Sequence, residues 1–256
     1  MKTLPILDQS TPFQAPYMPV LLTLVKQLQA DLSQQIHSIY LNGSVAARCA
    51  TVGESDINLT MVVNRELTAI EKRTVSTLCD HIAYRYDVVP SVDLRVITLD
   101  EVMTLSAIFK WGFWLKHCSV CLYGEDLASK FGLFEPSWEI AKAFNGDIKA
   151  VLADCRQKIM ATKSVTEYNA LCRIAGKKML RSSFMLVAHC TSSLAYSEQQ
   201  CADYFLHFYP DKAVEIERIQ ILIHGPQVPK RASLFLIEQF GQWIVAEFEK
   251  IEKKIG

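Results

Sequence analysis

Apolar residues recur along the chain with two periods, one typical of helices and one typical of strands. In roughly the first 135 residues, helical spacing over 17–34 and 67–86 alternates with short strand-like runs. These runs lie at 37–41, 55–63 and 92–97. Strands that alternate with helices predict an α/β or α+β arrangement of layers for this part of the chain.

Strand signals almost disappear in the rest of the chain. Helical spacing predicts long helices over 138–161 and 165–196 and a last amphipathic helix that ends near Lys254. Ser137 can cap the first of these helices, and the Gly- and Pro-rich segment 225–229 interrupts the chain before the last one. The second part is therefore expected to be a helical bundle.

Length and composition agree with two domains. The chain has 256 residues, of which 50% are hydrophobic, so two modest domains can each bury a core. We predict an α+β fold in which residues 1–135 form a mixed sheet with helices. Residues 136–256 are predicted to form an α-helical bundle.

The same patterns predict the cellular location of the protein and the redox state of its cysteines. No apolar run reaches the roughly 18 residues of a membrane span, and no secretory signal is visible, so we expect a cytoplasmic protein. The eight cysteines scatter through apolar segments, which favours reduced core thiols. Cys118 and Cys121 have metal or redox spacing, but a structural zinc site normally needs four ligands. A short strand over 118–123 is the favoured interpretation.

The segment 43–59 contains the strongest candidate chemistry. Gly43 and Ser44 open a turn whose backbone N–H groups and hydroxyl can hold an anion such as a phosphate. In the strand that follows, Asp56 and Asn58 project together from the face opposite the apolar residues. Mg²⁺ takes such oxygen ligands, usually with substrate phosphates. The pattern indicates a magnesium–nucleotide site, and the alternative is an Asp that only caps the turn.

A third carboxylate is available from the strand at 92–97. Alternation places Asp93 and Arg95 on the face opposite the apolar residues of that strand. Asp87 and Asp100 flank the same strand and are the alternatives to Asp93.

The order and spacing of these residues, over about 36–100, resemble the active-site signature of the minimal nucleotidyltransferases. These relatives of DNA polymerase β include the aminoglycoside nucleotidyltransferases. In that family a Gly-Ser turn precedes a Ser-Asp-x-Asp strand, and a later strand supplies a third acid. The chain departs from the pattern at Ala47 and Arg48, where many members have Arg-Gly, and at Asn58, which replaces the second Asp.

The resemblance implies a nucleotidyltransferase domain followed by a helical domain that selects the acceptor, as in the kanamycin and streptomycin nucleotidyltransferases. It implies transfer of a nucleoside monophosphate, AMP from ATP, to a hydroxyl of a small molecule or protein. Gly43 and Ser44 would bind the nucleotide's phosphates. Asp56, Asn58 and Asp93 would hold two Mg²⁺ ions, with Asp56 and Asp93 as the catalytic residues.

A stripe of cations in the second part of the chain is a further candidate. Arg173, Lys177 and Arg181 recur every four residues and so share one helix face. They could bind the nucleotide's triphosphate, or they could form a solvated face together with Lys178.

Charge limits the partners. Residues 138–256 hold sixteen basic and thirteen acidic side chains, which lowers the expectation of a polycationic aminoglycoside acceptor. No basic run tracks a nucleic-acid backbone, so we expect no template nucleic acid and no polymerase activity. The acceptor therefore stays open.

Asn58 divides the remaining hypotheses. An amide oxygen can ligate Mg²⁺, but it is neutral, so the site has one negative charge fewer than the family pattern with its second Asp. The first hypothesis is a nucleotidyltransferase whose two-metal catalysis is weakened. The alternative is a catalytically impaired relative that acts as a nucleotide-binding or partner-binding regulatory module.

Overall fold

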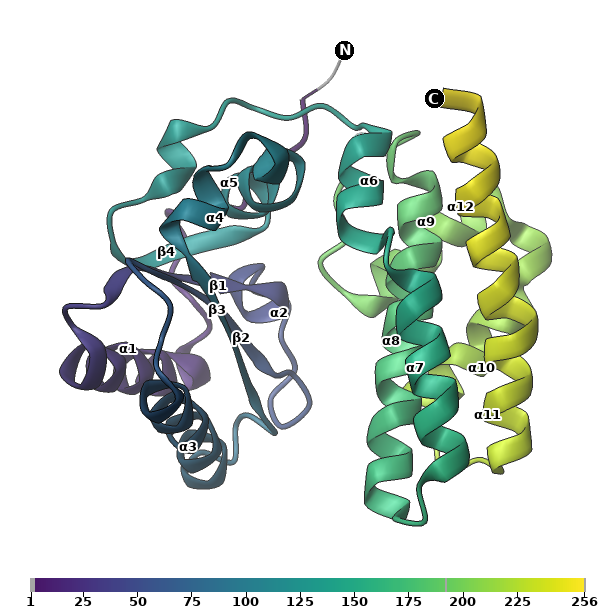
Figure 1. The fold of residues 1–256 in the computed structure, drawn as a ribbon, viewed down its shortest axis with the longest axis horizontal. Coiled ribbons are helices and arrows are strands. Elements are labelled where there is room, and N and C mark those ends of the chain that lie inside the picture. The colour runs from purple at the N-terminus through teal and green to yellow at the C-terminus, as the bar shows by residue number, and fades with distance from the viewer. Residues whose placement is uncertain (1–2, 192, 256) are drawn as a thin grey trace. The chain divides into compact units, whose positions relative to one another are not determined.

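The computed structural model describes residues 3–191 and 193–255, which fall into two compact units. The first is Thr3–Glu135, and the second is the chain from Pro136 onward. Figure 1 shows that the first unit is a sheet with helices and that the second is helical. This arrangement confirms the α+β fold class with a C-terminal helical bundle.

The sheet of the first unit has four strands in the order β3-β2-β1-β4. β1 (Ile36–Asn42) pairs antiparallel with β2 (Ile57–Val63) and with β4 (Ser119–Gly124). β2 pairs parallel with β3 (Val92–Thr98), so the sheet is mixed. All apolar residues of β2 are buried, as alternation predicts for one face. Burial extends to the other face because helices cover both.

Helices cover both faces of this sheet (Figure 1). α1 (Met18–Leu32), preceded by the 3₁₀ turn η1 (Ala15–Tyr17), packs with α3 (Ala69–Arg85) over one face. α4 (Leu99–Met103) and α5 (Phe113–His117) lie over the other face. Two short helical segments, η2 (Leu105–Ala107) and the π-helical η3 (Ile108–Gly112), connect α4 to α5.

Tyr40 anchors the core beneath α4 and α5. It packs in one cluster with Val62 from β2, Ile97 from β3 and Leu115 from α5. Its hydroxyl oxygen accepts a hydrogen bond from the backbone N–H of Leu127 at 2.7 Å. Burial raises the pKa of Tyr40, so its hydroxyl stays protonated.

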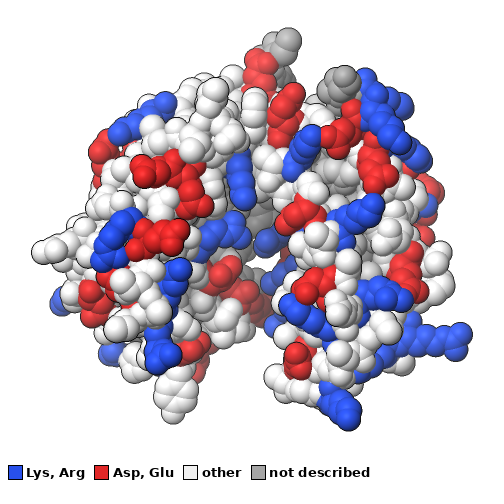
Figure 2. All heavy atoms as spheres, in the orientation of Figure 1, with Lys and Arg blue, Asp and Glu red and all other residues white. Residues whose placement is uncertain are grey.

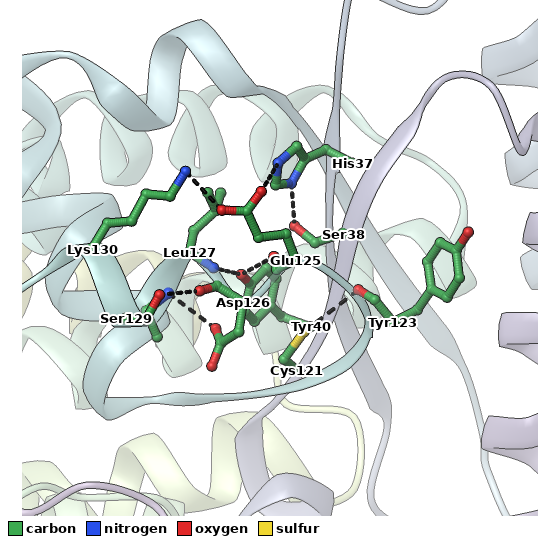
Figure 3. Close-up of polar contacts among 11 residues, drawn as sticks. His37, Ser38, Tyr40, Cys121, Tyr123, Glu125, Asp126, Leu127, Ser129 and Lys130 are labelled. Carbon is green, nitrogen blue, oxygen red and sulfur yellow. Dashed lines mark hydrogen bonds and ion pairs between the residues drawn. The ribbon is translucent and has the colours of Figure 1, made fainter.

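A polar cluster holds the 3₁₀ helix η4 (Leu127–Lys130) beside β1 (Figure 3). The Glu125 carboxylate lies 2.8 Å from Lys130 Nζ and 3.7 Å from His37 Nε2. The other ring nitrogen of His37, Nδ1, is 3.0 Å from Ser38 Oγ. This order of Ser, His and Glu resembles a catalytic triad, but Ser38 is completely buried and a substrate cannot reach it. We therefore assign the cluster a structural role.

The second unit is a bundle around α8 (Val165–Ala188), which packs against α6, α7, α9, α10 and α12. The other elements are α6 (Trp138–Asn145), α7 (Ile148–Ala161), α9 (Glu198–Phe208), η5 (Pro210–Lys212), α10 (Ala213–His224), α11 (Lys230–Leu236), π-helical η6 (Ile237–Gly241) and α12 (Gln242–Ile255). Their buried faces form one continuous hydrophobic core.

The single helix predicted over 138–161 is wrong, because the chain breaks between α6 and α7. Asn145 is buried, and its side-chain oxygen accepts a hydrogen bond from the Ser182 hydroxyl at 2.8 Å. A Cβ on Gly146 would lie 2.7 Å from the backbone oxygen of Lys142. The break therefore depends on a glycine and on a bond to a distant helix, neither of which changes the apolar period.

The helix predicted over 165–196 is too long, since α8 ends at Ala188. The hydroxyl of Thr191 donates to the backbone oxygens of Ala188, at 3.3 Å, and Ser193, at 3.2 Å. Ser and Thr hydroxyls compete in this way with the regular helical hydrogen bonds.

None of the described helices is both long and apolar enough to cross a membrane. On the face that Figure 2 shows, basic and acidic side chains are intermixed.

Substitution of three glycines by alanine separates the cost of backbone strain from the cost of steric overlap. Gly124 has φ +84°, and a Cβ there would lie 2.0 Å from the His37 backbone oxygen. Gly53 has φ +76° with nothing within 4 Å, whereas Gly132 has neither restriction. We expect Gly124→Ala to lower the free energy of unfolding by about 3 kcal/mol or more and Gly53→Ala by about 1 kcal/mol. Gly132→Ala should change it little. Urea denaturation measures all three, and equal losses would contradict this order.

His117 joins two segments of the first unit. Its Nδ1 lies 2.8 Å from the Pro5 backbone oxygen, and its Nε2 accepts from the Phe134 backbone N–H at 3.0 Å. These partners require a neutral ring with the proton on Nδ1. Burial lowers the pKa of His117 from its usual 6.5.

The stability of the protein should therefore fall as the pH drops below about 6.5. The unfolded chain then binds a proton that the folded His117 resists, so acid favours unfolding. Urea denaturation between pH 7.5 and pH 5 measures this slope. His117→Gln should lower stability at pH 7.5 and flatten the slope, whereas the same change at the exposed His81 should leave it steep. An unchanged slope in His117→Gln would show that other groups cause it.

Candidate functional site

The chain turns sharply where β1 ends. Asn42 is the last residue of β1, and the one-turn helix α2 (Gly43–Ala46) begins directly after it. Gly43 has φ +75°, which favours glycine, and a Cβ there would lie 3.2 Å from Asn58 Nδ2. A side chain at residue 43 would crowd the Asn58 amide, so glycine lets the Gly43–Ser44 backbone approach Asn58 closely.

Arg48 has an unusual backbone conformation just after this turn. Its φ is +58°, and it is the only residue other than glycine with positive φ among the described residues. In the minimal nucleotidyltransferases many members have glycine at this position of the pattern. The Arg48 guanidinium donates to the Thr11 backbone oxygen at 2.7 Å and lies 4.5 Å from the centre of the Phe13 ring. These contacts oppose the strain that a left-handed arginine introduces.

A second residue of the N-terminal segment holds the same loop. The Gln14 side chain donates to the Ala50 backbone oxygen at 3.0 Å and accepts from the Ala50 backbone N–H at 3.1 Å. The loop after the Gly-Ser turn is thus fixed from outside by the segment that precedes α1.

Strand register gathers the predicted metal ligands at one end of the sheet. Asn58 pairs with Asp93 across the parallel β2–β3 ladder and with Asn42 across the antiparallel β1–β2 ladder. Paired residues of neighbouring strands point to the same face. Asp56 lies two residues before Asn58 and is half-buried, whereas Asp93 is exposed. Their predicted role as ligands stays a prediction.

Ser91 is a site residue that the sequence patterns did not single out. Its hydroxyl donates to Asp56 Oδ1 at 2.6 Å, and its backbone oxygen accepts from the Ile57 N–H at 3.1 Å. Ser91 therefore fixes one oxygen of the Asp56 carboxylate. The only available signal was its position two residues before Asp93, which places both side chains on one face.

The amide groups near this carboxylate are also engaged. Asn58 Nδ2 donates to the Asp56 backbone oxygen at 3.3 Å. Asn42 is buried, and with its amide turned to satisfy its neighbours its nitrogen donates to the Asn58 backbone oxygen at 3.0 Å. Its oxygen then accepts from the Thr60 hydroxyl and from Trp114 Nε1, at 2.9 and 3.3 Å. Trp114 on α5 thus lies beside the acidic end of the sheet.

The candidate donor set has the oxygen chemistry that Mg²⁺ prefers, and its binding of the ion stays a prediction. The set consists of two carboxylates and one amide oxygen, and Mg²⁺ in nucleotide sites usually takes one or two carboxylates together with phosphates and water. The described residues contain no group of three or more His, Cys, Asp or Glu side chains that could hold a metal ion. The pair Cys118 and Cys121 is thus not part of such a group, and both thiols are free.

The predicted cation stripe lies on α8 of the helical unit. Arg173 and Arg181 are exposed there. Lys177 is half-buried, and its Nζ is 3.5 Å from Oε1 of Glu198. The other carboxylate oxygen of Glu198, Oε2, lies 2.6 Å from His224 Nε2. The stripe is therefore partly neutralised within its own unit. Its binding to a nucleotide stays a prediction.

Comparison with solved structures finds similarity over most of the chain. The structure is similar to the crystal structure of spectinomycin adenyltransferase AAD(9) from Enterococcus faecialis with ATP and spectinomycin. The two share 13% sequence identity, the match covers 90% of this chain and 98% of that chain, and the TM-score is 0.59. No family model matches the chain, and neither does any curated protein. The chain thus has the fold of a nucleotidyltransferase, which confirms the resemblance at the level of the fold.

Removing the Ser91 hydroxyl tests whether it positions the acidic end of the sheet. Ser91→Ala removes the hydrogen bond to Asp56 Oδ1 and with it one constraint on the carboxylate, so we expect affinity for Mg-ATP to fall about tenfold, or about 1.4 kcal/mol, in calorimetric titration. Ser129→Ala is the matched control, because it removes another exposed hydroxyl, bound 2.8 Å from the Asp126 backbone oxygen. Equal affinities in the two variants would exclude this role for Ser91.

Proposed function

We propose that the protein is a nucleotidyltransferase that moves AMP from ATP to a hydroxyl group of an acceptor. The observation that carries this proposal is the register that brings Asn58 and Asp93 together beside Asp56. The Gly43–Ser44 turn lies at the same end of the sheet, because Asn42 pairs with Asn58. The fold that the chain shares with an adenyltransferase supports the same reaction class.

The residues take distinct roles on the donor side of the reaction. Gly43 and Ser44 bind the nucleotide's phosphates through backbone N–H groups and a hydroxyl. Asp56, Asn58 and Asp93 hold Mg²⁺, which supplies Lewis-acid stabilisation of charge on the phosphoryl oxygens. Ser91 keeps the Asp56 carboxylate in one orientation by donating to its Oδ1. The turn and the carboxylates together orient the α-phosphorus for attack.

The transfer itself is an in-line displacement at phosphorus. The acceptor oxygen forms a bond to the α-phosphorus while the bond from that phosphorus to the bridging oxygen breaks. Pyrophosphate leaves with the electron pair of the broken bond. Asp93, which is exposed at the edge of the sheet, accepts the proton of the acceptor hydroxyl.

The helical unit contributes the remaining proposed contacts. Arg173 and Arg181 bind the triphosphate as exposed cations, and Lys177 adds a weaker charge because Glu198 lies 3.5 Å away. The unit as a whole selects the acceptor. These roles follow the resemblance to two-domain nucleotidyltransferases.

Asn58 sets the expected rate. It removes one negative charge from the residues that hold the metal, and each ~1.4 kcal/mol of lost transition-state stabilisation lowers the rate tenfold.

One observation also favours a second function, that of a nucleotide-binding regulatory module. The Asn58 amide nitrogen donates to the backbone oxygen of Asp56, so the amide has a structural role of its own within the site.

One substitution separates the two functions. Asn58→Asp restores a carboxylate and should raise Mg-dependent pyrophosphate release from ATP at least about tenfold with a panel of hydroxyl compounds. Asp56→Asn is the control and should abolish release. Release by the native protein supports the transferase, whereas release by Asn58→Asp alone supports the binding module. Absence of calorimetric Mg-ATP binding to the native protein contradicts both.

A further inference from the structure

Two cations share one indole ring beside the acidic end of the sheet. Arg95 lies two residues after Asp93 on β3, on the same face and about 7 Å farther along the strand. Its guanidinium carbon is 5.8 Å from the centre of the Trp111 ring. Lys110 Nζ lies 5.4 Å from the centre of the same ring. Both cations are exposed, whereas Trp111 is half-buried.

Protein carboxylates leave this positive charge largely uncompensated. Among the residues that the structure describes, no carboxylate lies within ion-pair distance of Arg95 or Lys110. Lys110 does contribute to the lowered pKa of Glu101. That carboxylate is held instead by the Thr98 backbone N–H and hydroxyl, each at 3.0 Å. Two cations beside one ring make this part of the surface locally positive, and an anion that binds there reduces the excess charge.

The topology places these cations on the acceptor side of the site. The Gly43–Ser44 turn follows β1, whereas Arg95 lies on β3, the edge strand two positions away and about 10 Å across the sheet. Asp93, the proposed proton acceptor, lies on the same edge strand as Arg95. A molecule that presents its hydroxyl to Asp93 can therefore place a second group near Arg95, whereas the Gly43–Ser44 turn lies two strands away.

We propose that the acceptor is a hydroxyl compound that bears a phosphate or carboxylate group. Arg95 and Lys110 bind that anion beside Trp111 while the hydroxyl reaches Asp93. This inference rests on the proposed function and narrows its acceptor to one charge class. The same two cations repel a polycationic acceptor, so the site disfavours an aminoglycoside.

Three small polyols of different charge test this class without requiring any catalysis. Glycerol 3-phosphate, glycerol and serinol share a three-carbon skeleton with hydroxyl groups and are anionic, neutral and cationic. Each is titrated into the native protein while the indole N–H signal of Trp111 is followed by NMR. Trp111→Phe assigns that signal among the four tryptophans of the chain.

Glycerol 3-phosphate should shift the Trp111 signal and bind at least tenfold more tightly than glycerol or serinol. The double variant Arg95→Gln/Lys110→Gln should lose this preference. Lys72→Gln/Arg73→Gln is the matched control, because it removes one Lys and one Arg from exposed positions of α3, over the opposite face of the sheet. Binding without regard to charge, tighter binding of serinol, or no response of Trp111 to any of the three overturns the proposal.

Mg-ATP titrations show whether Arg95 and Lys110 bind the anionic group of the acceptor or the phosphates of the nucleotide. If the cations serve the acceptor, the Arg95→Gln/Lys110→Gln variant binds Mg-ATP within about threefold of the native protein. A loss of tenfold or more assigns the cations to the nucleotide's own phosphates and overturns the proposal. A native protein that does not bind Mg-ATP overturns the proposed function and the acceptor role together. Normal Mg-ATP binding without a charge preference among the polyols overturns the acceptor class alone.

Discussion

The backbone pairing of β2 is the constraint on which the candidate site depends. β2 is held antiparallel by β1 and parallel by β3, so two ladders fix one register from both sides. A slip of one residue would move Asn58 to the opposite face of the sheet, where α1 and α3 pack. The apolar residues of β2 oppose such a slip because all of them are buried in the correct register. The core of the sheet therefore orients the polar residues at its end.

Two features reduce the negative charge at this end of the sheet, and the first is also a departure from the pattern of the minimal nucleotidyltransferases. A neutral amide at Asn58 reduces the negative charge available to a metal ion. Arg95 and Lys110 add positive charge on the edge-strand side, at the same indole ring. Both features make the site less negative; under the proposed function, the first affects the binding of a metal ion and the second the binding of the acceptor.

The sequence predicts the features that depend on neighbouring residues, and it does not predict those that depend on contacts between distant parts of the chain. The Gly43–Ser44 turn, the strand after it and the capped start of α6 at Ser137 depend on neighbouring residues, and the fold class follows from the same patterns. The break at Gly146 depends partly on a hydrogen bond between residues 145 and 182, which no local period records. Ser91 contacts Asp56 only because two strands from separate parts of the chain pair, so its role emerges from the structure.

The N-terminal segment and the loop after the Gly-Ser turn are thermodynamically coupled. Gln14 and Thr11 hold this loop through bonds to Ala50 and Arg48, so the loop cannot open without releasing the segment. The two form one cooperative unit for local unfolding. A ligand that favours the ordered loop must order the segment by the same free energy, and whatever frees the segment weakens that ligand equally. Residues that precede the first helix thereby stabilise the loop after the Gly-Ser turn from outside the turn itself.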